Sequence, residues 1–326
     1  MPAPRASSRL DRTRLRTRSA RSRPSKLELA QQAKPHARGA SLASFLAGLP
    51  DLLAAQELRL AIADASRARS RGKTLLWGLG AHVIKVGLSR VLVDLLERGF
   101  VSALMSNGAV CVHDLELALL GHTSEDVGPS LDDGSFGMAR ETAERLNTAI
   151  REGHADGLGM GEAIGREILS GRYPHKRRSL LAQATRAGVP VTVHSAIGTD
   201  IHHMHPSADG AALGATSYRD FETLAAVVAG LEGGVVFHLG SAVILPEVFL
   251  KALAVARNLG HGVRRFTAVD LDFVRHYRPR QNIVLRPTRL GGRGISLTGH
   301  HELLLPLLAA GLIESAGPVR RARRRT

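Results

Sequence analysis

Cysteine is almost absent from this sequence, because Cys111 is the single one among 326 residues. A lone cysteine cannot form a disulfide within the chain, which favours a reducing compartment, and we expect the cytoplasm. Long apolar runs are absent too: none approaches the ~18 residues that cross a bilayer, so we expect no membrane contact. The arginine-rich start also lacks the apolar segment of a secretory signal peptide.

Motifs that mark several known kinds of site are missing as well. There is no G-x-S-x-G of a serine nucleophile, no H-E-x-x-H zinc motif and no pair of cysteine ligands. Residues 202–205 carry an H-x-H spacing, but zinc needs three or four ligands in regular geometry, and we predict no metal. The glycine-rich run at 157–161 looks like a dinucleotide fingerprint. Because it does not follow a strand, we interpret it as a loop before a helix.

Acidic residues are too few to balance the basic ones, and the net charge is +15. Most of this charge lies in residues 1–26 and 317–326, which consist largely of Arg, Ser, Pro and Thr. Such segments cannot bury a core, so we predict disordered tails at 1–40 and 317–326. They could contact nucleic acid non-specifically through phosphates, or be solvated tails, with a true start nearer Leu27. We favour the solvated tails.

The middle of the chain alternates apolar, β-branched runs with helical patterns. The predicted strands lie at 74–79, 101–105, 189–194, 235–239 and 266–271, with possible edge strands at 283–286 and 294–297. We predict turns or loops at 80–87, 121–137 and 195–217. This alternation predicts one α/β domain over 41–316, with a mostly parallel sheet and helices on both faces.

Glycine, histidine and aspartate gather directly after the predicted strands. In a parallel sheet these loops meet at one edge, where cofactors and substrates bind. The stretch 233–258 shows the pattern best: a buried strand, the turn Gly240-Ser241, and a helix with Pro246 in its first turn. His113-Asp114 could be an oriented acid/base pair or a helix-start acid. Histidine suits proton transfer because it titrates near neutral pH.

Four segments of the chain resemble the deoxyhypusine synthase family. They are GLSRVLVDLLERGFVSALMSNGAVCVHDLELAL at 87–119, RETAERLN at 140–147, VPVTVHSAIGTD at 189–200, and the stretch 233–258. The small-residue loop and the His-Asp step also look like the NAD-binding domain of archaeal-type ornithine cyclodeaminases. The resemblance covers roughly 74–270. It implies a Rossmann-like NAD-binding fold, NAD as cofactor, a homo-oligomer (dimer or tetramer) and an amine or amino-acid substrate.

The sequence departs from that family where the family keeps a Schiff-base lysine. Leu245 stands in its place, and Lys251 lies nearly two helical turns away. The family's paired glutamates are replaced by Val112-His113. A leucine cannot form an imine, so aminobutyl transfer through this position is not expected.

The resemblance and the strand-end loops together predict a set of site residues. The predicted catalytic residues are His113, Asp200 and His203. The predicted substrate-binding residues are Asp200, His202, His205 and Asp209. The predicted cofactor-binding residues are Gly80, His82, Ser106, Asn107, Gly108, Ala109, Asp114, Gly240 and Ser241. We therefore predict an NAD-dependent transferase or oxidoreductase of deaminating type, acting on a polyamine, amine or amino acid without the lysine step. The alternative is a catalytically retired nucleotide-binding or regulatory protein of the same fold.

Overall fold

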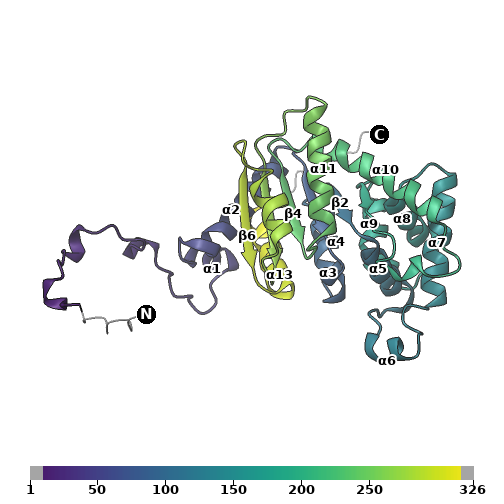
Figure 1. Ribbon diagram of the computed structural model, residues 1–326, viewed down its shortest axis with the longest axis horizontal. Helices are drawn as coiled ribbons and strands as arrows, with labels where there is room; N and C mark the ends of the chain where they lie inside the picture. The colour runs from purple at the N-terminus through teal and green to yellow at the C-terminus, as the bar shows by residue number, and fades with distance from the viewer. Residues whose placement is uncertain (1–9, 317–326) are drawn as a thin grey trace, which may run out of the picture.

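The computed structural model describes residues 10–316 and contains one six-stranded sheet (Figure 1). The strands are β1 (Leu75–Leu79), β2 (Ala103–Ser106), β3 (Val191–Val193), β4 (Val235–Leu239), β5 (Thr267–Asp272) and β6 (Arg293–Thr298). Their order is β3-β2-β1-β4-β5-β6, and every neighbouring pair is parallel. The predicted Rossmann-like α/β fold is confirmed.

Helices connect the strands and cover the sheet. The α-helices are α1 (Leu42–Gly48), α2 (Leu53–Ser70), α3 (His82–Lys85), α4 (Ser89–Glu97), α5 (Gly108–Leu120), α6 (Val127–Asp132), α7 (Arg140–Ala155), α8 (Met160–Ser170), α9 (Leu180–Arg186), α10 (Gly210–Ala229), α11 (Ile244–Asn258), α12 (Tyr277–Pro279) and α13 (His301–Ser315). The shorter helical turns are η1 (Arg12–Arg14), η2 (Ala20–Ser22), η3 (Leu29–Gln31), η4 (Lys176–Arg178), η5 (Ile201–His203) and η6 (Arg280–Leu285). Among the described residues, no helix is both long and apolar enough to cross a membrane.

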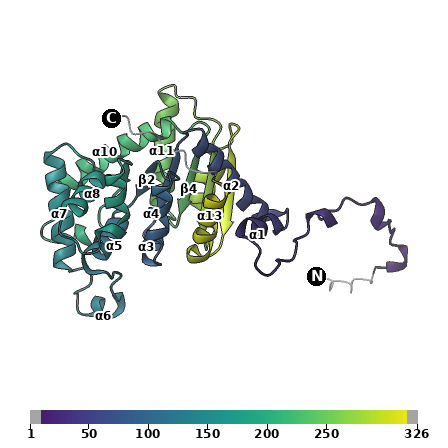
Figure 2. The same cartoon turned by 180° about the vertical axis from the view of Figure 1, so that it is seen from behind.

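Buried side chains form an apolar layer on each face of the sheet. In β1, Leu75, Trp77 and Leu79 join the layer that includes α2, α4, α5 and α13, whereas Leu76 joins the layer under α10 and α11. This alternation follows from the two-residue repeat of a strand. The two views show α11 on one face and α2, α4 and α13 on the other (Figures 1 and 2). Since both faces are covered, the ends of the strands are where polar loops can line a site.

The helices that follow the strands begin at recognisable capping residues. Asn107 caps α5, because its side chain accepts the Val110 N–H at 3.3 Å, and α5 ends at Gly121 with φ 79°. In α11, Pro246 lies in the first turn, where its missing N–H leaves no hydrogen bond unmade. These caps fix where each loop stops and therefore which residues stand at the edge of the sheet.

Four predicted local structures were wrong. Residues 283–286, predicted as an edge strand, form the end of the π-helical turn η6 and its C-cap Arg286, and Ile283 packs in the layer beside α11. Short apolar runs do not distinguish a strand from a buried helix. The predicted loop 195–217 ends early, because α10 begins at Gly210. The predicted loops 80–87 and 121–137 contain the short helices α3 and α6.

An N-terminal arm leads into the domain and lies to one side of it in both views (Figures 1 and 2). Residues 10–40 include only the turns η1, η2 and η3, and nearly all of these residues are exposed. The outer parts of the two predicted tails, 1–9 and 317–326, lie outside the described residues. The described arm therefore adds no apolar core to the domain.

Candidate active site at the carboxyl edge of the sheet

The loops after β1, β2, β3 and β4 meet at the carboxyl edge of the sheet, as the sequence predicts. A Cβ at Gly80 would lie 2.0 Å from the carbonyl oxygen of Gly240, so the turns after β1 and β4 are in contact. A Cβ at Gly108 would lie 2.3 Å from Oδ2 of Asp200, so the loop after β3 reaches the start of α5. Glycine allows this close approach. The carboxyl edge therefore has two neighbouring parts. One consists of the start of α5 and the loop after β3, and the other of the turns after β1 and β4.

Asp200 places its carboxylate at the amino end of α5. The residue is 7% exposed, and Oδ2 has no hydrogen-bond partner among the described residues. Burial raises the pKa of Asp200 to about 6, while the Thr199 hydroxyl and the Ala109 N–H act to lower it. A helix N-terminus attracts anions. Asp200 thus takes the position at which α5 would otherwise hold a phosphate.

Two histidines of η5 lie beside this carboxylate. Nδ1 of His203 accepts the N–H groups of Gly198 at 3.2 Å and of Asp200 at 3.4 Å. The proton of the neutral ring is then on Nε2, which lies 3.8 Å from Oδ2 of Asp200. Both ring nitrogens of His202 lack partners among the described residues, and burial, with His203 nearby, lowers its pKa to about 3. At neutral pH the cluster combines a carboxylate with two uncharged imidazoles.

His113 is held by hydrogen bonds that fix its tautomer. Thr123 Oγ1 donates to Oε2 of Glu116 at 2.5 Å, so Nδ1 of His113 donates to Thr123 Oγ1, at 2.7 Å. Thr142 Oγ1 donates to the other oxygen of Glu116 at 3.1 Å. Burial lowers the pKa of His113; Glu116 opposes this effect and Lys85 adds to it. The neutral ring therefore keeps a lone pair on Nε2, which can accept a proton.

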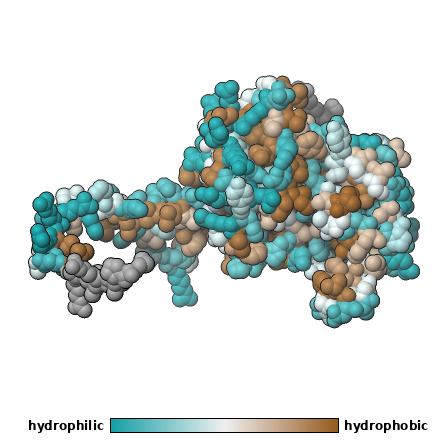
Figure 3. Space-filling view, in the orientation of Figure 1, coloured by the Kyte–Doolittle hydropathy of each residue, from teal (hydrophilic) through white to brown (hydrophobic). Residues whose placement is uncertain are grey.

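A cavity of about 150 Å³ joins these groups beneath the segment that contains α6. Its titratable lining residues come from α3, α5 and two loops: Lys85, His113, Glu116, Glu125 and Asp200. Val127 and Phe136 form part of its apolar wall. Exposed apolar side chains gather on and beside α6, as the brown area there shows (Figure 3): Leu120, Val127, Leu131 and Met138. The volume is below the ~300 Å³ at which pockets for larger ligands begin, so it suits a small molecule.

The other part of the edge is a group of rings between the turns after β1 and β4 and the start of α13. The ring of His82 lies 5.5 Å from that of His301, and both lie near Phe273, at 5.7 and 6.3 Å. His300 stacks parallel to Phe273 at 6.1 Å. Nε2 of His301 lies 3.1 Å from the carbonyl oxygen of Leu271, while Nδ1 is buried without a partner among the described residues. The helix α3 connects the two parts, because it runs from His82 to Lys85.

The turn after β4 holds no amine that could replace the family's lysine. Leu245 is 0% exposed and packs in the layer under α11, and its N–H donates to Oγ of Ser241 at 3.3 Å. Lys251 pairs with Glu247 on the same helix, and its side chain is 57% exposed. Lys85 is the lysine that lines the cavity.

Asp114, a predicted cofactor residue, lies inside the domain rather than at the cavity. It is 0% exposed, and its carboxylate accepts the Ser179 hydroxyl at 2.5 Å and the N–H groups of Leu180 and Leu181 at 2.8 and 3.1 Å. These bonds join α5 to the amino end of α9. Asp114 therefore has a structural task, and its cofactor role stays a prediction.

His205 and Asp209 also make local hydrogen bonds away from the cavity lining. Asp209 caps α10, since Oδ1 accepts the N–H groups of Ala211 and Ala212 at 2.9 and 3.0 Å. Nδ1 of His205 lies 2.8 Å from the hydroxyl of Ser207. Their predicted contact with substrate stays a prediction.

Sequence reasoning missed two residues that line the cavity, Lys85 and Glu116, and one that holds His113 from behind, Thr123. Lys85 follows β1 by only a few positions, and the rule that selected His82 would also have selected it. Glu116 stands three residues after His113, on the same helix face. Thr123 had no signal, because only the fold of the loop after α5 brings it to His113.

Two further observations concern metal binding and the choice between two cavities. Among residues 10–316, no group of three His, Cys, Asp or Glu side chains comes together in a way that could hold a metal ion. A larger cavity, of about 420 Å³, lies at the opposite edge of the sheet, and none of the predicted site residues lines it. The chemistry of the smaller cavity, and not its size, makes it the candidate active site.

Solved structures share this architecture at low sequence identity. A protein assigned as LOR/SDH from Methanococcus maripaludis S2 aligns with a TM-score of 0.53 and 14% identity, over 79% of this chain and 69% of its own. A protein assigned as deoxyhypusine synthase from Entamoeba histolytica aligns with a TM-score of 0.52 and 10% identity, over 87% and 96%. The chain has the deoxyhypusine synthase and LOR/SDH type of fold.

The same type of fold occurs within longer proteins. AgrE, in a ternary complex with ornithine and NAD+, aligns with a TM-score of 0.50 and 18% identity over 79% of this chain. The chain spans about a third of AgrE, 33% of its length. No protein-family model and no curated protein matches the sequence. At these identities the likeness establishes the fold alone.

Proposed function

We propose that this protein is an NAD-dependent enzyme that acts on a small cationic amine, polyamine or amino acid in the cavity beneath α6. One observation carries the proposal: a histidine with a free Nε2 and the carboxylate of Asp200, whose Oδ2 has no partner among the described residues, line the same small cavity. A carboxylate attracts an ammonium group, and a neutral imidazole accepts its proton. AgrE was solved with ornithine and NAD+, and its similar fold supports the ligand class.

The cofactor fits one part of the edge and not another. The amino end of α5 does not fit a diphosphate, because Asp200 already places an anion there. The turns after β1 and β4 fit better: Gly80 and Gly240 carry no side chain where these turns meet, and the buried Nδ1 of His301 lacks a partner among the described residues. Gly80, His82, Gly240, Ser241 and His301 would hold NAD. When bound, NAD supplies a hydride acceptor.

The residues of the cavity would divide the remaining work. Asp200 binds the cationic group, and the Nε2–H of His203 faces the same carboxylate at 3.8 Å, without a hydrogen bond to it. His113 takes the proton released as the substrate is oxidised, while Glu116 keeps its tautomer fixed. Lys85 helps to keep His113 uncharged, because a nearby positive charge disfavours protonation.

The alternative function, a catalytically retired nucleotide-binding or regulatory protein, has one observation in its favour. Leu245, which the sequence resemblance places where the family keeps its Schiff-base lysine, is fully buried. Such a protein would bind NAD and leave every amine unchanged. The proposed enzyme needs no imine at that position, since its amine chemistry takes place at His113.

The first experiment measures the thermal unfolding of the protein with NAD or NADH at millimolar concentration. We expect both to raise the melting temperature, because a ligand that binds the folded state stabilises it. The protein is then incubated with NAD and ornithine, arginine or spermidine, and the absorbance of NADH is followed. Absence of any thermal shift would overturn the proposal. A shift without NADH formation for any amine would favour the retired protein.

Two variants test the role of His113. His113→Ala should abolish NADH formation and keep the thermal shift, whereas the exposed control His122→Ala should change neither. Because the pKa of His113 is lowered, turnover should stay constant at neutral pH and fall only below the ordinary value of 6.5. Lys85→Ala removes a charge that lowers this pKa, so the fall should begin at a higher pH. Unchanged turnover in His113→Ala would exclude it as the base.

A further inference from the structure

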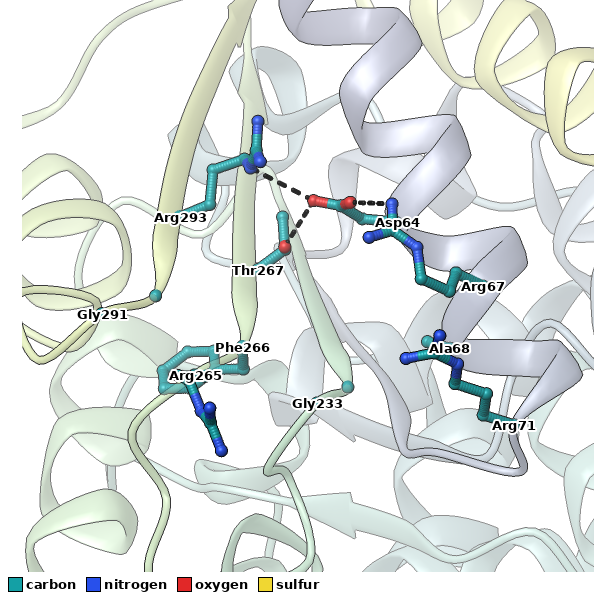
Figure 4. Close-up of a pocket in the computed structure, with 12 residues that line it drawn as sticks. Asp64, Arg67, Ala68, Arg71, Gly233, Arg265, Phe266, Thr267, Gly291 and Arg293 are labelled. Atoms are coloured by element: carbon teal, nitrogen blue, oxygen red, sulfur yellow. Dashed lines mark hydrogen bonds and ion pairs between the residues drawn. The ribbon is translucent and has the colours of Figure 1, made fainter.

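A cavity of about 420 Å³ lies at the amino edge of the sheet, away from the candidate active site (Figure 4). Its walls come from the end of α2, the turn before β4, and the starts of β5 and β6. The lining residues include one acid, Asp64, and four arginines: Arg67, Arg71, Arg265 and Arg293. The cavity is thus strongly positive.

Asp64 organises one side of this cavity. Its carboxylate pairs with Arg67 at 2.8 Å and Arg293 at 3.3 Å, and it accepts the hydroxyl of Thr267 at 2.7 Å (Figure 4). Its side chain is only 10% exposed. A guanidinium carries five N–H donors, so both arginines keep donors free after pairing with one carboxylate. Asp64 therefore orders these two arginines without neutralising both.

The remaining arginines stand on facing walls. Arg71 is exposed and has no ion pair among the described residues. Arg265 pairs through Nε with Glu232 at 3.0 Å, which leaves its terminal nitrogens free. Gly233, with φ of 76°, lies between them, and Gly291, with φ of 112°, lies beside Arg265; a side chain at either position would be strained. The cavity stays open between positive groups on two sides.

We propose that this cavity binds a small molecule with two or more linked phosphate groups, at a site separate from the active site. Guanidinium groups match the geometry of phosphate oxygens and bind them in pairs. One phosphate would engage one wall only, whereas a linked pair can engage Arg71 and Arg265 together with Arg67. The volume falls within the ~300–1,000 Å³ of ligand pockets.

Tripolyphosphate and inorganic phosphate are the probes, and isothermal titration calorimetry of the full chain at low, fixed salt measures their Kd. The test variant is Arg71→Ala with Arg265→Ala. The control, Arg90→Ala with Arg172→Ala, removes the same charge from exposed arginines outside the cavity. Far-UV circular dichroism checks that both variants are folded.

We expect tripolyphosphate to bind more tightly than phosphate. We also expect the test variant to raise its Kd at least about tenfold, because two charged hydrogen-bonding groups are lost, with little change in the control. Equal weakening in both variants would show attraction to net charge and overturn the proposal. So would wild-type affinity in the test variant. Binding of a single-stranded oligonucleotide, without binding of tripolyphosphate, would also overturn it.

Discussion

Replacing Asp114 by alanine separates a structural role from a cofactor role at one position. The carboxylate is fully buried and accepts three hydrogen bonds, from the Ser179 hydroxyl and from the N–H groups of Leu180 and Leu181. Alanine would leave all three donors without an acceptor, at the start of α9. Because two of them are N–H groups of the first turn, the variant also removes a helix cap.

The expected loss follows from these contacts. A buried donor left without an acceptor costs ~1–3 kcal/mol, and this variant leaves all three donors unpaired. Burial of the carboxylate is itself unfavourable, as the raised pKa of Asp114 shows, and its removal returns part of that cost. We therefore expect the free energy of unfolding to fall by ~3 kcal/mol, the lower end of the summed cost for three donors.

Urea unfolding followed by circular dichroism measures this loss. With an m-value of about 3 kcal/mol per molar, the midpoint should fall by roughly 1 M at unchanged slope. The exposed Asp156→Ala is the matched control and should leave the midpoint in place. If Asp114→Ala unfolds like the wild type and loses NAD affinity instead, the structural assignment fails.

Three further changes test the edge and the core. Gly108→Ala places a Cβ 2.3 Å from Oδ2 of Asp200. In thermal unfolding we expect this variant to be less stable by ~1–3 kcal/mol, despite the better helix propensity of alanine. A stabilised variant would contradict this packing. Leu245→Lys buries an amine in the layer under α11, so it should lower the melting temperature. We expect mass spectrometry to find no imine trapped by borohydride. A trapped imine would show that position 245 is accessible to substrate. The pKa of His202 is about 3 in the folded protein and ordinarily 6.5. As the pH drops below 6.5, His202 is protonated in the unfolded chain before it is protonated in the folded protein, so the free energy of unfolding falls. Between pH 7 and pH 5, the free energy of unfolding measured in urea should fall by ~2 kcal/mol less in His202→Leu than in the wild type. Equal falls in the two proteins would contradict the lowered pKa of His202.

The sheet could be predicted because its strands carry their own signal. The run at 235–239 is apolar except for His238 and is bounded by glycine, and every residue of β4 is buried. The meeting of the strand-end loops followed from parallel order alone. Residues 283–286 show where this signal fails. Ile283 and Val284 are as apolar as the residues of a buried strand, yet they belong to the helical turn η6 and pack beside α11.

The details of the site depend on contacts between residues far apart in sequence. The sequence places Asp200 after a strand, but it does not show that the carboxylate reaches the amino end of α5. Asp114 and Asp209 look like ligand-binding acids in the sequence, yet both accept backbone N–H groups at helix starts. The hydrogen bonds that mark these two acids as helix caps become visible only in the fold.

The pairing of β1 with β4 has a consequence for folding during synthesis. β1 pairs with β2 on one side and with β4 on the other, and β4 is made only after all helices from α5 to α10. The half-sheet β3-β2-β1 can form first, with an unpaired edge of β1 that carries apolar residues of the core. Unpaired apolar edges recruit other chains. A nascent chain that stalls within α10 should therefore aggregate, and docking of β4 should be the slow, long-range step of folding.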